Sequence, residues 1–186
     1  MNESRTRKEF LRTLAAGIGA LAGQRLVGSD TPKTSTRGAR EMVSTLTGPV
    51  APGDLGTMLV HEHVLHGSIP AELRDRSVEI ALGHLQEAAR VGIDSVACLS
   101  PERDIRLYAE IAKRSPVRIV ASTGSYVYPR SSPALQQMNE GQMFERMVRE
   151  ITVGIDGTTL RAGIIKVAGA RAPLTEWERT AFRAAG

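Results

Sequence analysis

The sequence of 186 residues contains a single cysteine, Cys98, and this scarcity excludes two kinds of structure. No disulfide can form within the chain, and no metal site can be built from several thiolates. Any bound metal therefore needs nitrogen or oxygen ligands. Cys98 itself lies in the apolar run Val96–Leu99, where we expect a buried and unreactive thiol.

Aromatic residues make up only 4% of the sequence, and the basic residues are concentrated near its start. Residues 1–40 hold eight of the 24 Lys and Arg and three of the 20 Asp and Glu, so the remainder carries 16 basic and 17 acidic side chains. The net charge of +4 therefore comes from the N-terminal segment. No basic face with interleaved aromatics remains, and we expect no nucleic-acid partner.

Long apolar runs and the serine-hydrolase motif GxSxG are also missing. A serine nucleophile of that type is therefore not indicated. The apolar stretch Leu11–Gly23 is too short to span a bilayer, so we expect no stable membrane insertion. The composition, 41% hydrophobic and 24% charged, is typical of a globular chain with one sizeable core.

Residues 1–28 resemble an export leader. Basic residues precede the apolar stretch, and Thr6–Arg12 (TRKEFLR) is similar to the twin-arginine motif, with Lys8 in place of the second arginine. The expected location is periplasmic or secreted; the alternative is an uncleaved N-terminal helix on a cytoplasmic protein. Residues 29–40 are Ser, Thr, Pro, Gly and basic residues without apolar periodicity, which predicts a flexible linker.

From Glu41 onward, short β-rich runs alternate with helical patterns, which is typical of a parallel α/β sheet or barrel. We predict four strand–helix units. The expected strands cover residues 57–65, 93–99, 118–124 and 162–168. Apolar stripes at helical spacing mark the expected helices, with members Val78 to Ala89, Ile105 to Ala112, Phe144 to Ile151 and Trp177 to Ala185.

Two helix starts can be assigned from short motifs, and one loop from its prolines. Ser100-Pro101 is the expected N-terminal cap of the second helix. Thr175 and Glu178, three residues apart, form a capping box before the fourth helix. Residues 126–133 contain two prolines and are expected to form a loop.

The first predicted strand, Thr57–Leu65, ends in His61-Glu62-His63. Side chains two residues apart on a strand point to the same face, so His61 and His63 can offer two imidazoles to one metal ion. Imidazole nitrogens suit zinc, cobalt, iron and similar ions. Two ligands alone do not make a site, and a polar strand end facing solvent is the alternative interpretation.

The fourth predicted strand contains Lys166 among Ile164, Ile165 and Val167. One interpretation is a strand-end lysine whose amine extends to solvent. The other is chemical: a desolvated lysine has a lowered pKa, and its neutral amine can capture carbon dioxide. The resulting carbamate is a carboxylate able to bridge two cations, one of which the HxH strand could hold.

Three motifs in order resemble the phosphotriesterase-like family of the amidohydrolase superfamily. MVSTLTGPVAPGDLGTMLVHEHVLH, from Met42 to His66, is similar to the start of that family and its first strand. STGSY, which ends at Tyr126, and AGIIKVAG followed by TEWE resemble its third strand, its fourth strand and the helix after it. The resemblance extends from Met42 to Gly186.

The resemblance implies a TIM (β/α)8 barrel, of which residues 41–186 would form the N-terminal half, the first four βα units, because such barrels need about 250 residues. It also implies two divalent metal ions, with zinc the expected metal. His61 and His63 would ligate the more buried ion, and carbamylated Lys166 would bridge both. Tyr126 resembles the aromatic residue that lactonase-type members place close to the substrate.

The implied activity is hydrolysis of an ester-like bond in a small molecule, either a lactone or a phosphotriester, by a metal-activated water. The family completes its ligand set with two histidines and an aspartate after strands five, six and eight, which have no counterpart here. We therefore expect the 186-residue chain to be inactive alone. The alternative is a non-catalytic half-barrel that associates with another chain, for instance as a homodimer.

Overall fold

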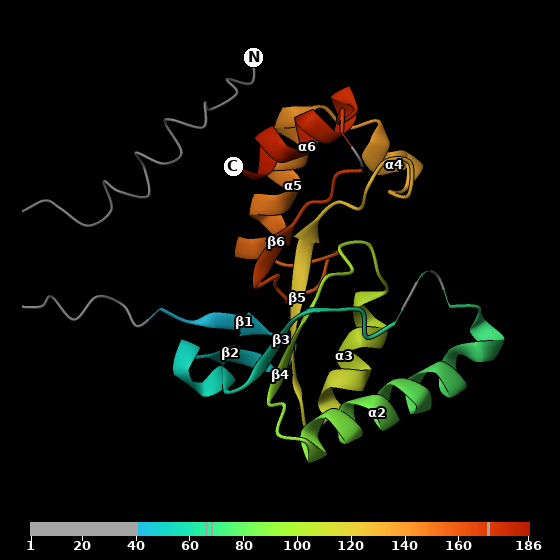
Figure 1. Cartoon of the computed structure of the whole chain (residues 1–186), viewed down its shortest axis with the longest axis vertical. Helices are drawn as coiled ribbons and strands as arrows, with labels where there is room; N and C mark the ends of the chain where they lie inside the picture. Colours follow the sequence, from blue (N-terminus) through green and yellow to red (C-terminus); the bar gives the residue numbers. More distant parts are fainter. Residues whose placement is uncertain (1–40, 66, 68, 171) are drawn as a thin grey trace, which may run out of the picture. The chain divides into compact units, whose positions relative to one another are not determined.

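The computed structural model describes residues 41–186 except 66, 68 and 171 (Figure 1). The predicted leader, residues 1–28, and linker, residues 29–40, lie outside the described residues. The strands are β1 (Val43–Thr45), β2 (Gly48–Val50), β3 (Met58–Glu62), β4 (Ser95–Cys98), β5 (Arg118–Gly124) and β6 (Ile164–Lys166). The helices are η1 (Pro52–Leu55), η2 (Ala71–Leu73), α2 (Arg74–Arg90), α3 (Ile105–Arg114), α4 (Pro133–Gln136), α5 (Glu140–Thr152) and α6 (Glu176–Ala185).

Four of the strands form a parallel sheet in the order β3-β4-β5-β6. Each strand pairs with its neighbour in the sequence, and helices lie in the connections between them (Figure 1). Parallel neighbours need such long connections, because the chain must return to the same end of the sheet. The predicted α/β class and the four parallel strands are confirmed, whereas the complete eight-stranded barrel stays a prediction.

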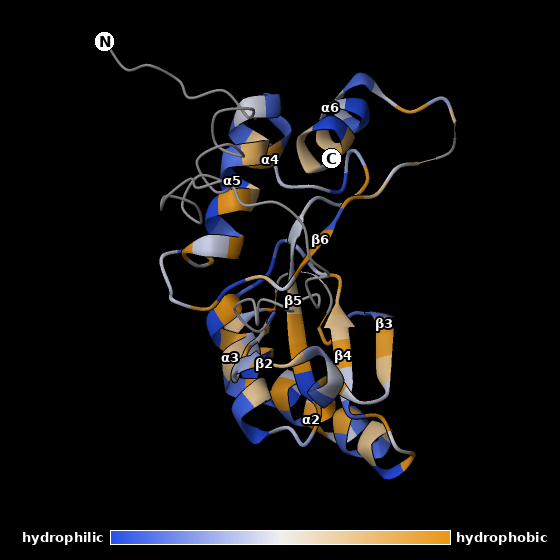
Figure 2. Ribbon diagram, turned by 90° about the vertical axis from the view of Figure 1, so that its left-hand side faces the viewer, coloured by the Kyte–Doolittle hydropathy of each residue, from blue (hydrophilic) through white to orange (hydrophobic). Residues whose placement is uncertain are grey.

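The two central strands form the middle of the core. Val96 and Ala97 of β4 and Ile119 and Val120 of β5 are each at most 2% exposed. Strands of a parallel sheet that are covered on both faces read as continuous apolar runs rather than alternating ones. Figure 2 shows this apolar colouring along β4 and β5, while α2 and α3 carry both colours.

Helices α2 and α3 follow their predicted apolar stripes, whereas α5 buries Met143, Met147 and Glu150 and leaves the predicted members Phe144, Val148 and Ile151 half-buried. Val78, Leu82 and Leu85 of α2 are buried in the same cluster as the sheet residues, and the chain turns at Gly92 with φ +89°. A second cluster joins α5 and α6 through Met143, Met147, Ala181, Ala184 and Leu135. In the described part of the chain, no helix is both long and apolar enough to cross a membrane.

The start of α3 differs from the prediction. Its N-cap is Asp104, whose carboxylate accepts from the amides of Arg106 at 3.0 Å and Leu107 at 3.1 Å. The predicted cap at Ser100-Pro101 is therefore wrong. Asp is as good an N-cap as Ser, and here the chain runs four residues further before it turns into the helix.

An antiparallel hairpin of β1 and β2 precedes the sheet and was not predicted. Thr45 pairs with Gly48, and the Thr45 hydroxyl donates to the Gly48 carbonyl at 2.6 Å. The amide of Leu46 donates to the Ile119 carbonyl at 2.9 Å. The hairpin is therefore attached near the N-terminal end of β5, away from the carboxyl ends of the strands.

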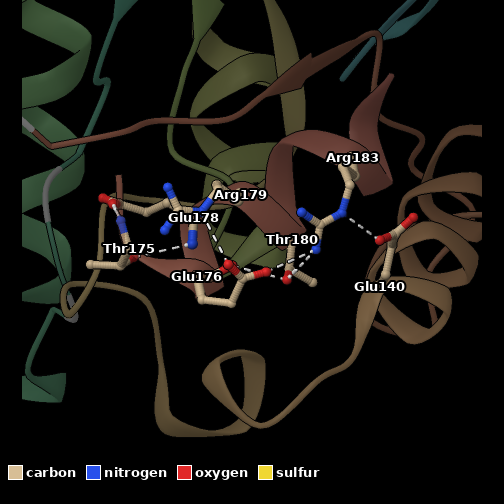
Figure 3. Close-up of polar contacts among 7 residues, drawn as sticks. All are labelled: Glu140, Thr175, Glu176, Glu178, Arg179, Thr180 and Arg183. Carbon is tan, nitrogen blue, oxygen red and sulfur yellow. Dashed lines mark hydrogen bonds and ion pairs between the residues drawn. The ribbon is translucent and has the colours of Figure 1, made fainter. Parts of the chain in front are cut away.

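The capping box of α6 is confirmed (Figure 3). The Thr175 hydroxyl accepts from the Glu178 amide at 3.2 Å, and the Glu178 carboxylate accepts from the Thr175 amide at 2.8 Å. An ion pair of 2.8 Å between Arg183 and Glu140 connects α6 to α5. The buried face of α6 consists of Glu178, Ala181 and Ala184, whereas the predicted members Trp177 and Ala185 are half-buried.

Candidate metal centre

The carboxyl ends of three parallel strands carry the residues that the sequence singles out. His61 lies in β3, His63 follows that strand directly, Tyr126 comes two residues after β5, and Lys166 is the last residue of β6. Because the strands are parallel, their carboxyl ends meet at one edge of the sheet. Residues more than a hundred positions apart in the sequence are thereby placed at the same edge.

Ring and amine distances show that these side chains lie together. The imidazole centroids of His61 and His63 are 5.7 Å apart, with planes inclined by 62°. His63 stacks on Tyr126 at 6.2 Å, and the Lys166 Nζ lies 4.2 Å from the centre of the Tyr126 ring. The four residues therefore form one continuous group, although their role as metal ligands and substrate contact stays a prediction.

A β-bulge occurs in β3 just where the first histidine lies. Leu59 pairs with Val96 and Glu62 pairs with Cys98, so three steps along β3 match two steps along β4. Such bulges turn side chains away from the regular alternation and increase the local twist, often beside active sites. The extra residue falls between Leu59 and Glu62, and both Val60 and His61 are exposed there.

Ser100 fixes the orientation of the second histidine. Its hydroxyl lies 2.9 Å from His63 Nδ1 and 3.4 Å from the Leu65 carbonyl. When the hydroxyl donates to Leu65, its oxygen accepts from an Nδ1–H group, which places the imidazole lone pair on Nε2. Metal-bound histidines are oriented in this way by a partner on the other ring nitrogen. The sequence analysis did not identify this role of Ser100.

Tyr108 holds the segment that follows β3. Its hydroxyl donates to the Leu65 carbonyl at 2.8 Å and accepts from the Leu65 amide at 3.2 Å. Burial raises the pKa of the Tyr108 phenol, so the group stays neutral and keeps its donor proton. Tyr108 was predicted only as part of an apolar stripe, and its hydroxyl contributes a function that periodicity does not reveal.

Burial shifts the Lys166 amine toward its neutral form. Burial lowers the pKa of the Lys166 amine, and the Glu102 carboxylate opposes this effect. Because the desolvation effect is the larger one, the fraction of neutral amine is greater than for an exposed lysine. A neutral amine is the form that reacts with carbon dioxide.

The backbones of β5 and β6 approach each other closely at the site. Gly124 pairs with Lys166 and adopts φ +111°, and a Cβ atom at position 124 would collide with the Lys166 carbonyl oxygen. The Ser125 amide donates to that same oxygen at 2.9 Å. Glycine is required here both for the backbone conformation and for the space.

The donor set fits part of a metal site. Among residues 41–186 other than 66, 68 and 171, no three His, Cys, Asp or Glu side chains are grouped so that they could hold a metal ion. The predicted set offers two imidazoles, and Lys166 would add oxygen ligands only as a carbamate. These residues would supply one side of a binuclear centre, and this role stays a prediction.

Comparison with protein families matches residues 41–186 to the phosphotriesterase family, which is most of the chain. The chain belongs to the phosphotriesterase family. The resemblance seen in the sequence is thereby confirmed, and the parallel sheet with its polar carboxyl edge is the corresponding part of a phosphotriesterase-family fold.

Individual relatives agree with this phosphotriesterase-family assignment. N-acetyltaurine hydrolase of Xenopus tropicalis is 35% identical over 82 residues, which cover 44% of this chain and 24% of the relative. The phosphotriesterase homology protein of Mycobacterium tuberculosis is 30% identical over 160 residues, covering 76% of this chain and 49% of the relative.

A solved structure is similar over most of the described chain. It is a double mutant of an organophosphorus hydrolase from Deinococcus radiodurans, 28% identical, with a TM-score of 0.70. The match covers 80% of this chain and 50% of that structure. The chain therefore spans half or less of the length of these phosphotriesterase-family relatives.

Proposed function

We propose that residues 41–186 form the first four βα units of a (β/α)8 metal-dependent hydrolase and carry one side of its binuclear site. The observation that supports this most directly is the chain of contacts at the carboxyl edge of the sheet, from His61 to His63, from His63 to Tyr126 and from Tyr126 to Lys166. In barrels of this kind the active site lies at that edge. Two divalent ions, with zinc the expected metal, would complete the centre.

The proposed substrate is a small molecule with an ester-like bond, either a lactone or a phosphotriester. The similar solved structure is described as an organophosphorus hydrolase, and another relative as an N-acetyltaurine hydrolase. Both names describe hydrolases, and of the two the organophosphorus hydrolase supports an ester-like bond. Tyr126, half-buried beside the predicted ligands, would contact the substrate.

Each residue of the site has a defined part in this proposal. His61 and His63 would hold one ion through imidazole nitrogens, and Ser100 orients His63. The Lys166 amine would add to carbon dioxide: a nitrogen–carbon bond forms and one amine proton passes to solvent. The two oxygen atoms of the resulting carbamate would then be available as metal ligands. When bound, the ions would supply an activated water and polarise the carbonyl or phosphoryl oxygen.

A second candidate is a non-catalytic half-barrel that associates with another copy. The outer strands of the described sheet, β3 and β6, expose Val60 by 70%, Ile164 by 37% and Ile165 by 39%. Unpaired strands with apolar side chains readily pair with another chain. Light scattering of the purified chain distinguishes this candidate, which requires a defined dimer, from a monomeric fragment.

Metal uptake tests the ligand assignment. The 186-residue chain is purified in bicarbonate with added zinc, and bound metal is measured beside turnover of a lactone and an aryl phosphotriester. We expect the double variant His61→Ala, His63→Ala to lose the metal, and little turnover by any form of the chain alone. His84→Ala, which removes an exposed histidine of α2, is the matched control and should keep the metal.

Equal metal content in the double variant and the control would contradict the assignment of His61 and His63. Two metals per chain, with turnover that disappears in the double variant, would show instead that this part of the barrel is already a working enzyme.

A further inference from the structure

Arg146 of α5 makes three polar contacts behind the candidate metal centre. Its Nε pairs with the Glu150 carboxylate at 2.9 Å, one Nη donates to the Gly124 carbonyl at 2.9 Å, and the other Nη donates to the Pro101 carbonyl at 3.2 Å. The Arg146 side chain is only 15% exposed and that of Glu150 only 3%. Every nitrogen of the guanidinium is therefore engaged, largely away from solvent.

The two carbonyls belong to the segments that carry the site. Pro101 directly follows Ser100, whose hydroxyl contacts His63. Gly124 ends β5 and is followed by Ser125, which binds the Lys166 carbonyl, and then by Tyr126. One guanidinium thus connects the segments that follow β4 and end β5. One segment carries Ser100, which contacts His63, and the other leads to Tyr126, which contacts Lys166.

We infer that Arg146 is a positioning residue for the candidate metal centre. By binding the Pro101 and Gly124 carbonyls it sets the separation of Ser100 and Tyr126. Through these two residues it fixes the orientation of the His63 imidazole and the place of the Lys166 amine. The inference rests on the proposed function, because it concerns the residues of that same site.

The chemistry of the contact requires an arginine. The guanidinium is planar and presents its donors in a fixed fork, so it can bind two carbonyls and a carboxylate at once. A lysine at position 146 keeps the positive charge beside Glu150 but has a single nitrogen. It cannot reach all three acceptors with the same geometry, so the two strand ends lose their common anchor.

The Glu150 carboxylate makes the outcome of a truncation different from that of a conservative change. Without Arg146, this buried carboxylate loses its ion-pair partner, which strongly destabilises a fold. Arg146→Met is therefore expected to impair folding in general. Arg146→Lys keeps the charge and is the variant that separates positioning from stability.

Two signals in the metal-free 186-residue chain report on position without any metal. The Lys166 Nζ lies over the Tyr126 ring, so the adjoining ε-methylene protons should show an upfield ring-current shift in the NMR spectrum. The ring-nitrogen shifts of His63 should show a fixed tautomer, with the proton on Nδ1 facing Ser100. Zinc affinity, measured by competition with a chelating dye, is the third readout.

Arg146→Lys should fold but lose about half of the Lys166 ring-current shift. Its zinc affinity should fall about 10-fold, as it does when other residues that orient metal ligands are changed. Arg149→Lys, which changes an exposed arginine of the same helix, should leave all three readouts unchanged. Val78→Ala, which removes core volume in α2, should lower stability while leaving the two NMR signals in place.

Wild-type Lys166 and His63 signals in folded Arg146→Lys would overturn the inference. So would an equal disturbance in Val78→Ala, because the effect would then follow from stability alone. If Arg146→Lys loses both signals that the wild-type chain shows, but the wild type binds no zinc, the metal-ligand assignment in the proposed function fails while the positioning role of Arg146 stands.

Discussion

The imidazole of His63 lies almost parallel to the ring of Tyr126, with centroids 6.2 Å apart and planes inclined by 24°. The Lys166 amine lies 4.2 Å from the centre of the same ring. One aromatic side chain from the loop after β5 therefore contacts two predicted ligands that come from different strands. The ring acts as a spacer between them, which makes Tyr126 a residue of the site's structure as well as a candidate substrate contact.

Replacing Tyr126 should separate the role of its ring from that of its hydroxyl. Tyr126→Phe keeps the stacking surface and the cation–π contact, whereas Tyr126→Ala removes both. We expect Tyr126→Ala to be less stable than Tyr126→Phe by about 1 kcal/mol, since a partly exposed cation–π contact contributes on that order. Urea denaturation of the two variants measures the difference, and equal midpoints would contradict the spacer role.

Removing the hydroxyl of Ser100 should weaken metal binding without loss of fold. In Ser100→Ala the Nδ1 atom of His63 loses its partner, and the imidazole can rotate or change tautomer. We expect zinc affinity to fall about 10-fold. Ser122→Ala is the control, because its buried hydroxyl has no hydrogen-bond partner in the described part of the chain. A similar loss of affinity in both variants would argue against a specific role for Ser100.

The stability contributed by Lys166 should depend on pH in a definite direction. Burial lowers the pKa of the amine below its ordinary value of 10.5, so the folded chain binds fewer protons at this group than the unfolded chain. Stability then rises with pH between the lowered folded pKa and 10.5. In carbonate-free buffer, we expect the free energy of unfolding of the wild type to increase relative to that of Lys166→Met as the pH rises across this window.

A difference between the wild type and Lys166→Met that stays constant with pH would mean that the Lys166 pKa is ordinary in the folded chain. Burial raises the pKa of the Tyr108 and Tyr126 phenols above 10.0 in the folded chain, so ionisation of the unfolded phenols lowers stability as the pH passes 10.0, and the comparison is made below that pH.

The capping box of α6 offers a test of the fold remote from the site. In Thr175→Ala the Glu178 amide loses its acceptor (Figure 3), and we expect a loss of about 1 kcal/mol in the free energy of unfolding. Thr152→Ala is the control, because its exposed hydroxyl only donates to the Val148 carbonyl within α5. Thermal denaturation should show a lower midpoint for the first variant alone.

Export should depend on the predicted leader. We propose that the basic residues, TRKEFLR and the apolar stretch direct this chain out of the cytoplasm. Deleting residues 1–22 should keep the protein in the cytoplasm, while changing the linker sequence between residues 29 and 40 should not. Cell fractionation measures this, and equal periplasmic recovery with and without the leader would exclude an export signal.

The elements that could be predicted from the sequence are those with regularly spaced apolar residues and clear start or stop residues. β5 has the predicted bounds, Arg118–Gly124: its apolar run Ile119–Ala121 lies in the core, every residue after Arg118 is buried, and Gly124 ends the strand. α2 buries its predicted stripe, and α6 starts at its predicted capping box. The positions of His61, His63 and Lys166 could be proposed together because strand ends of a parallel sheet meet at one edge.

Other features depend on contacts between distant residues, which local patterns do not encode. Ser100 resembles a helix cap, but its hydroxyl binds His63 while Asp104 caps α3. Arg146 lies on an ordinary helical face, and only the folded chain brings the Pro101 and Gly124 carbonyls to it. The β1–β2 hairpin was missed because its strands have three residues each, too few for a visible alternation.

The close approach of Gly124 to the Lys166 carbonyl restricts how this site can change through mutation. A library that randomises position 124 should return folded chains only with glycine, whereas position 126, whose side chain is half-buried, should accept several aromatic residues. New substrate preferences would therefore arise from the loop beyond β5 and not from the strand end itself. The same tight contact fixes the distance between β5, which leads to Tyr126, and β6, which carries Lys166, so that distance cannot vary while the rest of the loop does.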